Sequence, residues 1–223
     1  MSVNDLGVIA VIGGTGSEGS GFALRWARAG LDVVIGSRMA EKGQRVAAEL
    51  SERLDGVTIR GADNLSAAAQ ADVVVLSVPY ESQEANLAGI AEALPGKLLV
   101  TVVAPLLGEK KGRYKPAPGG SAAMEAQAQL GDDVRVVAAF QNVGAHHLAD
   151  FDHEFDCDVL VCGNRKADRE IAVALAGAAG MRGVHAGALQ NAAVAEGLTA
   201  VLISINAIYK TRSAGIRITG LPQ

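Results

Sequence analysis

The sequence predicts an α/β protein built on a doubly wound parallel sheet, with a small C-terminal α/β unit. Apolar, β-branched runs alternate with alanine-rich amphipathic segments through the first 140 residues, and such alternation of strands and helices produces a parallel sheet. Residues 73–76 are apolar at every position, as strands are when helices cover both faces of a sheet. A glycine-rich segment directly follows the first apolar run, where a tight turn into a helix is expected.

The first part of the chain is expected to alternate strands with helices. The candidate strands are residues 7–12, 32–36, 57–60, 72–78, 97–103 and 134–139. The candidate helices between them are residues 17–29, 40–54, 64–70, 81–94 and 121–130. The ligand crevice of such a sheet lies beyond the carboxyl ends of its strands, so the residues directly after each strand are the candidates for a site.

The remainder of the chain has a different pattern. A short strand at residues 158–162 precedes a helix at 166–179, an extended segment at 181–185 and a long alanine-rich helix at 189–210. We therefore expect two domains, a larger one at residues 1–149 and a small C-terminal one at residues 150–223 that includes the long helix.

Composition excludes several classes of protein. Of the 223 residues, 49% are hydrophobic and 20% are charged, which is typical of a globular chain and not of a disordered one. The net charge of −4 argues against a nucleic-acid partner. The uncharged stretch at residues 197–209 is shorter than the roughly 20 residues that a membrane span needs. With no secretory signal evident, we expect a cytoplasmic protein without a membrane partner.

The strongest motif is the turn after the first strand, where Gly14, Gly16 and Gly19 fit G-x-G-x-x-G. Between an apolar strand and a helix, this pattern indicates dinucleotide binding in a Rossmann-type fold. The glycines permit a tight turn, close approach to a pyrophosphate and close packing of the helix, and the helix N-terminus offers N–H groups to phosphates. Residues 1–149 are therefore expected to bind a dinucleotide; an ordinary glycine-rich turn is the alternative.

The end of the second strand predicts which dinucleotide binds. NAD-binding sites place Asp or Glu there to bond the ribose 2′-hydroxyl, whereas this strand ends in Ser37 and Arg38. A guanidinium holds phosphate through paired hydrogen bonds, and Lys42 lies four residues on, where it would share a helix face with Arg38. We predict NADP(H) over NAD(H); the alternative is that Arg38 is a solvated residue at a helix start.

Residues after the later strands predict the reacting end of the crevice. Val78 and Pro79 follow the fourth strand, where they could contact a nicotinamide ring, although a proline also ends a strand for steric reasons. His146 and His147 follow the sixth strand, but adjacent loop histidines are more often surface groups. With no obvious acid or base, we predict no catalytic side chain, no metal site, and direct hydride exchange between two rings.

Several motifs together resemble the NADPH-dependent F420 reductase family, also called F420H2:NADP oxidoreductases. The resemblance covers essentially the whole chain. The segments that show it are Gly13-Gly14-Thr15-Gly16, Gly36-Ser37-Arg38, Ser77-Val78-Pro79-Tyr80-Glu81, Phe155-Asp156-Cys157-Asp158-Val159-Leu160-Val161-Cys162-Gly163, Glu196-Gly197-Leu198-Thr199 and Gly215-Ile216-Arg217. The glycine turn is generic, whereas the Phe155–Gly163 segment and the short chain are more specific.

The resemblance implies an oxidoreductase that transfers a hydride between NADP(H) and coenzyme F420, a 5-deazaflavin and its co-substrate. It also implies a homodimer. By motif, the residues next to the 2′-phosphate would be Thr15, Ser37 and Arg38, those at the pyrophosphate Gly14, Gly16 and Ser17, and those beside the nicotinamide Val78 and Pro79. The residues that border the deazaflavin would be Asn142, Val143, Thr199, Ala214 and Gly215.

Two other functions stay open from the residues alone. One is an NADPH-dependent reductase of another small acceptor, such as a flavin, a ferric chelate, an imine or a keto acid, for which only Asn142, His146 or Thr199 could supply a polar group near the nicotinamide. The other is an NADPH-binding redox sensor. The long helix at residues 189–209 is apolar around most of its circumference, which independently suggests a two-fold partner.

Overall fold

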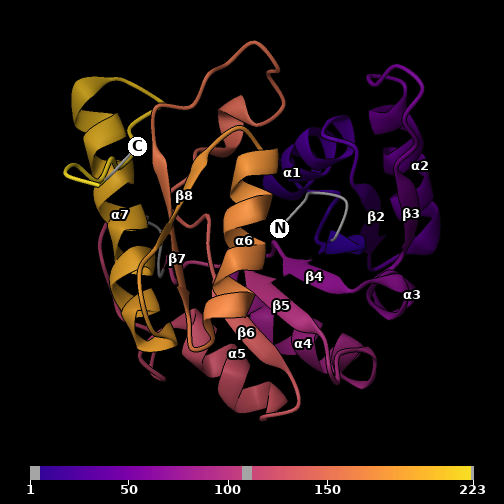
Figure 1. The fold of residues 1–223 in the computed structure, drawn as a ribbon, viewed down its shortest axis with the longest axis horizontal. Coiled ribbons are helices and arrows are strands. Elements are labelled where there is room, and N and C mark those ends of the chain that lie inside the picture. The colour runs from indigo at the N-terminus through magenta and orange to yellow at the C-terminus, as the bar shows by residue number, and fades with distance from the viewer. Residues whose placement is uncertain (1–5, 107–111, 222–223) are drawn as a thin grey trace.

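The computed structural model describes residues 6–106 and 112–221, which form one eight-stranded sheet between two layers of helices (Figure 1). The strand order is β3-β2-β1-β4-β5-β6-β7-β8. The strands are β1 Val8–Ile12, β2 Asp32–Ser37, β3 Arg60–Asp63, β4 Val73–Leu76, β5 Leu98–Thr101, β6 Arg135–Ala138, β7 Asp158–Gly163 and β8 Arg182–His185. The predicted α/β class with a doubly wound sheet is confirmed.

The helices lie in two sets, one on each face of the sheet. They are α1 Ser17–Arg28, α2 Ala40–Ser51, α3 Asn64–Gln70, α4 Gln83–Ile90, α5 Ala122–Leu130, α6 Lys166–Ala178 and α7 Ala192–Tyr209. Short 3₁₀ turns are η2 Tyr80–Ser82, η3 Ala91–Ala93, η4 Ala145–His147 and η5 Leu189–Asn191. Residues 81–94 and 189–210 were each expected to be one helix, and both expectations are wrong in detail, because 3₁₀ turns occupy their ends.

Alternating side chains of β1 show how the core is divided. Ile9 and Val11 pack with α1, α2 and α6 on one face, whereas Ala10 and Ile12 pack with α3, α4, α5 and the start of α7 on the other. Successive residues of a strand point to opposite faces, so a strand that is apolar throughout serves two cores. This accounts for the uninterrupted apolar runs in the sequence.

The sheet is parallel from β3 through β6 and continues into the C-terminal part of the chain. β7 pairs with β6 in the antiparallel sense, with Ala138 opposite Cys162, and β8 pairs with β7 in the parallel sense. In Figure 1 the orange and yellow elements β7, β8, α6 and α7 therefore lie beside β6 at one end of the sheet. The sheet is continuous across the position at which we divide the chain, between residues 149 and 150.

The third strand lies three residues later than the sequence predicts. We expected residues 57–60, but β3 is Arg60–Asp63, paired with Val34–Ser37 of β2. β3 is an edge strand and is only half-buried, so its sequence lacks an apolar pattern. Gly61 is required because α2 crosses closely above it: a Cβ there would overlap the backbone of Gly43.

The strand order reverses direction at β1, which has β2 on one side and β4 on the other. Ile12 lies opposite both Gly36 and Leu76 at the carboxyl ends of these strands. A doubly wound sheet binds its ligand outside the strand ends at this reversal, which places the site above β1 and β4.

Candidate functional site

The turn from β1 to α1 passes directly over the end of β4. Gly13 has a φ of 81°, and a Cβ on it would overlap the carbonyl oxygen of Ser77. A Cβ on Gly14 would lie 2.6 Å from Cβ of Ile35, and one on Gly19 would lie 2.8 Å from the Gly13 carbonyl oxygen. Glycine is therefore required at these positions by close packing within the turn.

The N-terminus of α1 is open for an anion. Its N-cap residue is Gly16, no side chain caps the helix, and both Gly16 and Ser17 are exposed. The first N–H groups of a helix have no partner within the helix and attract negative charge. A phosphate group therefore fits this position, as the glycine motif predicts; Thr15 beside it is half-buried.

Of the residues predicted to select NADP, Ser37 ends β2, Arg38 follows it, and Lys42 lies in the first turn of α2. Arg38 and Lys42 are exposed, and within residues 6–106 and 112–221 neither forms a recorded ion pair. Ser37 is buried, and its hydroxyl accepts the N–H of Met39 at 3.4 Å. We predicted that Arg38 and Lys42 share a helix face. This prediction is wrong, because α2 begins at Ala40 and Arg38 precedes the N-cap.

A crevice of about 530 Å³ lies above the strand ends. Its walls come from the first turn of α1 and from the residues that follow β4, β5 and β6, together with one residue of α7. The predicted site residues that line it are Gly16, Ser17, Val78, Pro79, Val143 and Thr199. The crevice therefore connects the open end of α1 with residues of the C-terminal helix.

A glutamine that the sequence analysis did not select lies in this crevice. Gln141 is 4% exposed, and its Nε2 donates to the carbonyl oxygen of Thr101 at 2.8 Å. Its Oε1 is buried and has no hydrogen-bond partner among the described residues. The hydroxyl of Thr199 donates to the Gln141 carbonyl oxygen at 2.8 Å. An amide within three residues of the end of a buried strand was the available signal, since the residues beyond the carboxyl ends of the strands face the crevice.

The sequence analysis also missed a hydrogen-bonded pair, Glu18 and Ser77, at the other wall. Ser77 Oγ donates to Oε2 of Glu18 at 3.0 Å, which joins the end of β4 to the first turn of α1. Burial raises the pKa of the Glu18 carboxyl to about 7, and the hydrogen bond from Ser77 opposes part of this rise. Glu18 stands directly before the third glycine of the motif, a position that the motif leaves free.

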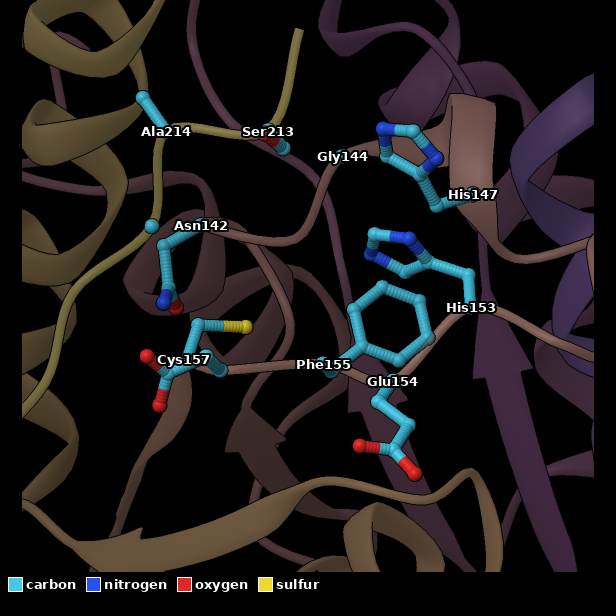
Figure 2. A pocket seen from close by; sticks show the side chains of 11 residues that line it. Asn142, Gly144, His147, His153, Glu154, Phe155, Cys157, Ser213 and Ala214 are labelled. Carbon is cyan, nitrogen blue, oxygen red and sulfur yellow. The ribbon is translucent and has the colours of Figure 1, made fainter.

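The other predicted substrate residues line a second, smaller pocket of about 140 Å³ (Figure 2). Asn142, Ala214 and Gly215 belong to it, whereas Val143 and Thr199 belong to the crevice. Asn142 Nδ2 donates to the Asp158 carbonyl oxygen at 2.7 Å. The structure therefore divides the predicted deazaflavin residues between two neighbouring pockets.

The two adjacent histidines also stand apart from the crevice. His147 lines the second pocket and stacks on His153 with 3.9 Å between ring centroids, and Figure 2 shows these rings beside Phe155. His146 is exposed and lines neither pocket. The Arg25 guanidinium fixes this loop by donating to the carbonyl oxygens of residues 147, 148, 150 and 153.

Helix α7 is held over the crevice by a buried carboxylate. Glu196 is 2% exposed, and its two oxygens accept the N–H groups of Ala122 at 2.7 Å and Ala123 at 3.0 Å, at the start of α5. Burial raises the pKa of Glu196 to about 7, against the lowering effect of these two hydrogen bonds. The contact fixes the helix that supplies Thr199 to the crevice.

Comparison with known proteins finds relatives that match nearly the whole chain. The sequence model of a family described as "NADP oxidoreductase coenzyme F420-dependent" matches residues 8–105. The chain is 42% identical over 222 residues to the F420-dependent NADP reductase of Methanothermobacter thermautotrophicus, with 96% of each chain covered. It is 40% identical over 221 residues to the F420-dependent NADP reductase of Methanocaldococcus jannaschii, with 96% of this chain and 98% of the relative covered.

A solved structure extends the likeness to three dimensions. It comes from Arthrobacter sp. FB24 and is described as a candidate F420-dependent NADP-reductase. The TM-score is 0.80 at 28% sequence identity, and the match covers 96% of this chain and 100% of that one. The shared fold therefore includes β7, β8 and the long C-terminal helix as well as the nucleotide-binding part.

Proposed function

The chain belongs to the family of F420-dependent NADP reductases, and from this premise we infer that it transfers a hydride between NADP(H) and the deazaflavin coenzyme F420. The observation that supports this most strongly is identity above 40% along 96% of the chain with reductases of that name. The crevice above β1 and β4 is the part of the structure that this reaction would use.

The nucleotide half of the proposal rests on the turn after β1. The N–H groups at Gly16 and Ser17 would hold the pyrophosphate beside Gly14. Arg38, with Lys42, Ser37 and Thr15, would surround the 2′-phosphate. The exposed cations beyond β2 support this assignment, because a guanidinium favours a phosphate that a carboxylate there would repel.

The reacting half of the proposal rests on the crevice walls. Val78 and Pro79 would flank the nicotinamide, and Val143 and Thr199 would contact the deazaflavin ring across the same space. Asn142, Ala214 and Gly215 line the neighbouring pocket. We propose that these three contact a part of F420 that extends out of the crevice.

The proposed reaction does not require a reactive side chain. Bound together, the two coenzymes exchange a hydride between ring carbons, and neither ring needs a protein nucleophile. The protein's contribution is to hold the rings in contact and to exclude water from between them. Val78, Val102, Val103 and Val143 give the crevice the apolar surface that this requires.

The direct test is NADPH oxidation, followed at 340 nm, with F420 as the acceptor. We expect turnover that depends on added F420, and much poorer turnover with NADH. FMN, riboflavin and a ferric chelate serve as competing acceptors. Reduction of one of these in preference to F420 would reassign the acceptor, whereas NADPH binding without any turnover would indicate a sensor.

The exposed face of helix α7 indicates how the protein assembles. Helix α7 leaves apolar side chains in solvent, with Val194 69%, Val201 48% and Ile208 72% exposed. The segment Leu189–Tyr209 is long and apolar enough to cross a membrane by length and composition alone, and 33% of its apolar 18-residue window is buried. We propose that its exposed face pairs with a second copy in a homodimer, because the opposite face bonds α5 through Glu196.

We also propose that the dimer acts in the cytoplasm, and that residues 1–149 bind the nucleotide while residues 150–223 complete the F420 side. Sedimentation equilibrium at micromolar concentration tests the dimer. A monomer there, or partition of the protein into the membrane fraction of lysed cells, would contradict this assembly.

A further inference from the structure

Glu18 is a carboxylate that lies between the phosphate-binding turn and the residues that would form the nicotinamide wall in the proposed function. It belongs to the first turn of α1 and lines the crevice together with Ser77, Val78 and Pro79. The 3.0 Å hydrogen bond from Ser77 Oγ holds its carboxyl against the end of β4. The proposed hydride transfer does not use the Glu18 carboxyl.

The described residues around Glu18 contain little that could neutralise the negative charge of its carboxylate. Among the described residues that line the crevice there is no Lys, Arg or His. The titratable neighbours among the described lining residues are Tyr80 and Glu81 of η2, while the lining residues that follow β5 and β6, and Thr199 of α7, are uncharged. The Tyr80 hydroxyl donates to Glu125 at 2.9 Å, and Glu81 is exposed. Among the lining residues that the structure describes, Glu18 therefore faces no positive charge.

The nicotinamide ring of the proposed nucleotide ligand gains a positive charge when it is oxidised. When a hydride leaves the nicotinamide ring with both bonding electrons, the neutral ring of NADPH becomes the cationic ring of NADP⁺. We propose that Glu18 determines how strongly the crevice prefers NADP⁺ over NADPH. Its carboxylate attracts the cationic ring of NADP⁺ and not the neutral ring of NADPH. This rests on the proposed function, which puts the nicotinamide beside Val78 and Pro79.

The effect of Glu18 on the relative affinity for NADP⁺ and NADPH should depend on pH. A carboxylate within about 6 Å of an opposite charge has its pKa lowered by about 1–3 units. The pKa of Glu18, which burial raises to about 7 in the free protein, should thus be lower with NADP⁺ bound than with NADPH bound. By linkage, NADP⁺ binding then favours loss of the proton, so the affinity for NADP⁺ relative to NADPH rises with pH.

The test measures three ligands by isothermal titration calorimetry between pH 5.5 and 8.5, using the full chain without F420. The ligands are NADP⁺, NADPH and 2′-phospho-ADP-ribose, which lacks the nicotinamide. For the wild type we expect the ratio of NADP⁺ to NADPH affinity to rise about tenfold or more across this range, since tenfold corresponds to one unit of pKa difference.

Three variants assign the effect to a residue. Glu18→Gln keeps an acceptor for Ser77 but has no charge, so its affinity ratio should not change with pH. Glu81→Gln removes the other carboxylate of the crevice and should leave the rise in place. Ser77→Ala removes the hydrogen bond that lowers the pKa of Glu18, so the rise should move to higher pH. Circular dichroism confirms that each variant is folded.

Two results would overturn the proposal. The first is a wild-type affinity ratio that is independent of pH; if all three ligands then show the same pH dependence, Glu18 responds to the phosphates and not to the nicotinamide. The second is the same rise in Glu18→Gln as in the wild type. Failure of the wild type to bind either nucleotide would instead overturn the proposed function.

Discussion

The hydroxyl of Thr199 donates a hydrogen bond of 2.8 Å to the carbonyl oxygen of Gln141. Thr199 is on the long C-terminal helix and Gln141 lies three residues after the end of β6, so this bond joins the two parts of the chain at the crevice. The position of the C-terminal helix and the shape of the crevice are therefore coupled.

Replacing Thr199 tests this coupling. Thr199→Val keeps the volume of the side chain but removes the donor, so we expect a higher KM for F420 and a loss of about 1 kcal/mol in the free energy of unfolding. The Kd for NADP⁺ should not change. Thr199→Ser retains the hydroxyl and is the matched control. If the two variants have the same KM for F420, the hydrogen bond does not position the second substrate.

Replacing Arg38 tests the choice of nucleotide. Arg38→Ala should weaken NADPH binding by about 1.5–3 kcal/mol, the contribution of a hydrogen bond to a charged group, and should leave NADH binding nearly unchanged. Arg45→Ala is the control, because Arg45 is an exposed cation on α2 that pairs with Glu49 at 2.8 Å. Equal losses for both nucleotides in Arg38→Ala would exclude a contact to the 2′-phosphate.

The glycine turn can be tested with two glycines that both have positive φ. Gly13→Ala adds strain at a φ of 81° and also an overlap with the Ser77 carbonyl oxygen. Gly30→Ala adds strain at a φ of 88° but meets nothing within 4 Å. We expect Gly30→Ala to lower stability by about 1 kcal/mol and to leave Kd for NADPH unchanged, whereas Gly13→Ala lowers stability further and weakens NADPH binding. Fluorescence titration with NADPH and urea unfolding measure both effects.

The buried Glu196 predicts how stability varies with pH. Its pKa is raised from 4.5 to about 7 in the folded protein, so between these values the unfolded state loses the proton more readily than the folded state. The free energy of unfolding should fall as pH rises from about 4.5 to 7, by no more than about 3 kcal/mol, and then level off. Glu18 contributes in the same direction.

Urea unfolding of the wild type and of Glu196→Gln across this pH range checks the effect. The variant should be less stable at pH 5, because its amide nitrogen cannot accept the N–H of Ala122 or Ala123, but its stability should fall less with pH. A wild type that gains stability from pH 5 to 7 would contradict the assignment to Glu196 and Glu18.

Much of the fold could be predicted because burial on both faces leaves a strong pattern in the sequence. Strands β4 and β5 are buried throughout and β1 is buried after its first residue, and apolar runs predict them within a few residues. β3 was misplaced because an edge strand buries little, and because close packing of α2 requires Gly61 where an apolar residue would have marked the strand.

The candidate site was predictable only in part. The glycine turn and the cations beyond β2 follow from local rules that link residue type to phosphate binding. Glu18 and Gln141 acquire their properties from tertiary contacts with Ser77, Thr101 and Thr199, and no local pattern marks such contacts. The division of Asn142 and Val143 between two pockets also depends on how the C-terminal segment packs.

A single-turnover reaction with NADPH deuterated at nicotinamide C4 tests the central claim most directly. If the crevice holds the two rings in contact and shields them from water, the deuterium from the reactive face should appear in the reduced F420 and not in the solvent. Deuterium found in water, or full oxidation of NADPH with F420 left unreduced, would contradict direct hydride transfer between the two coenzymes.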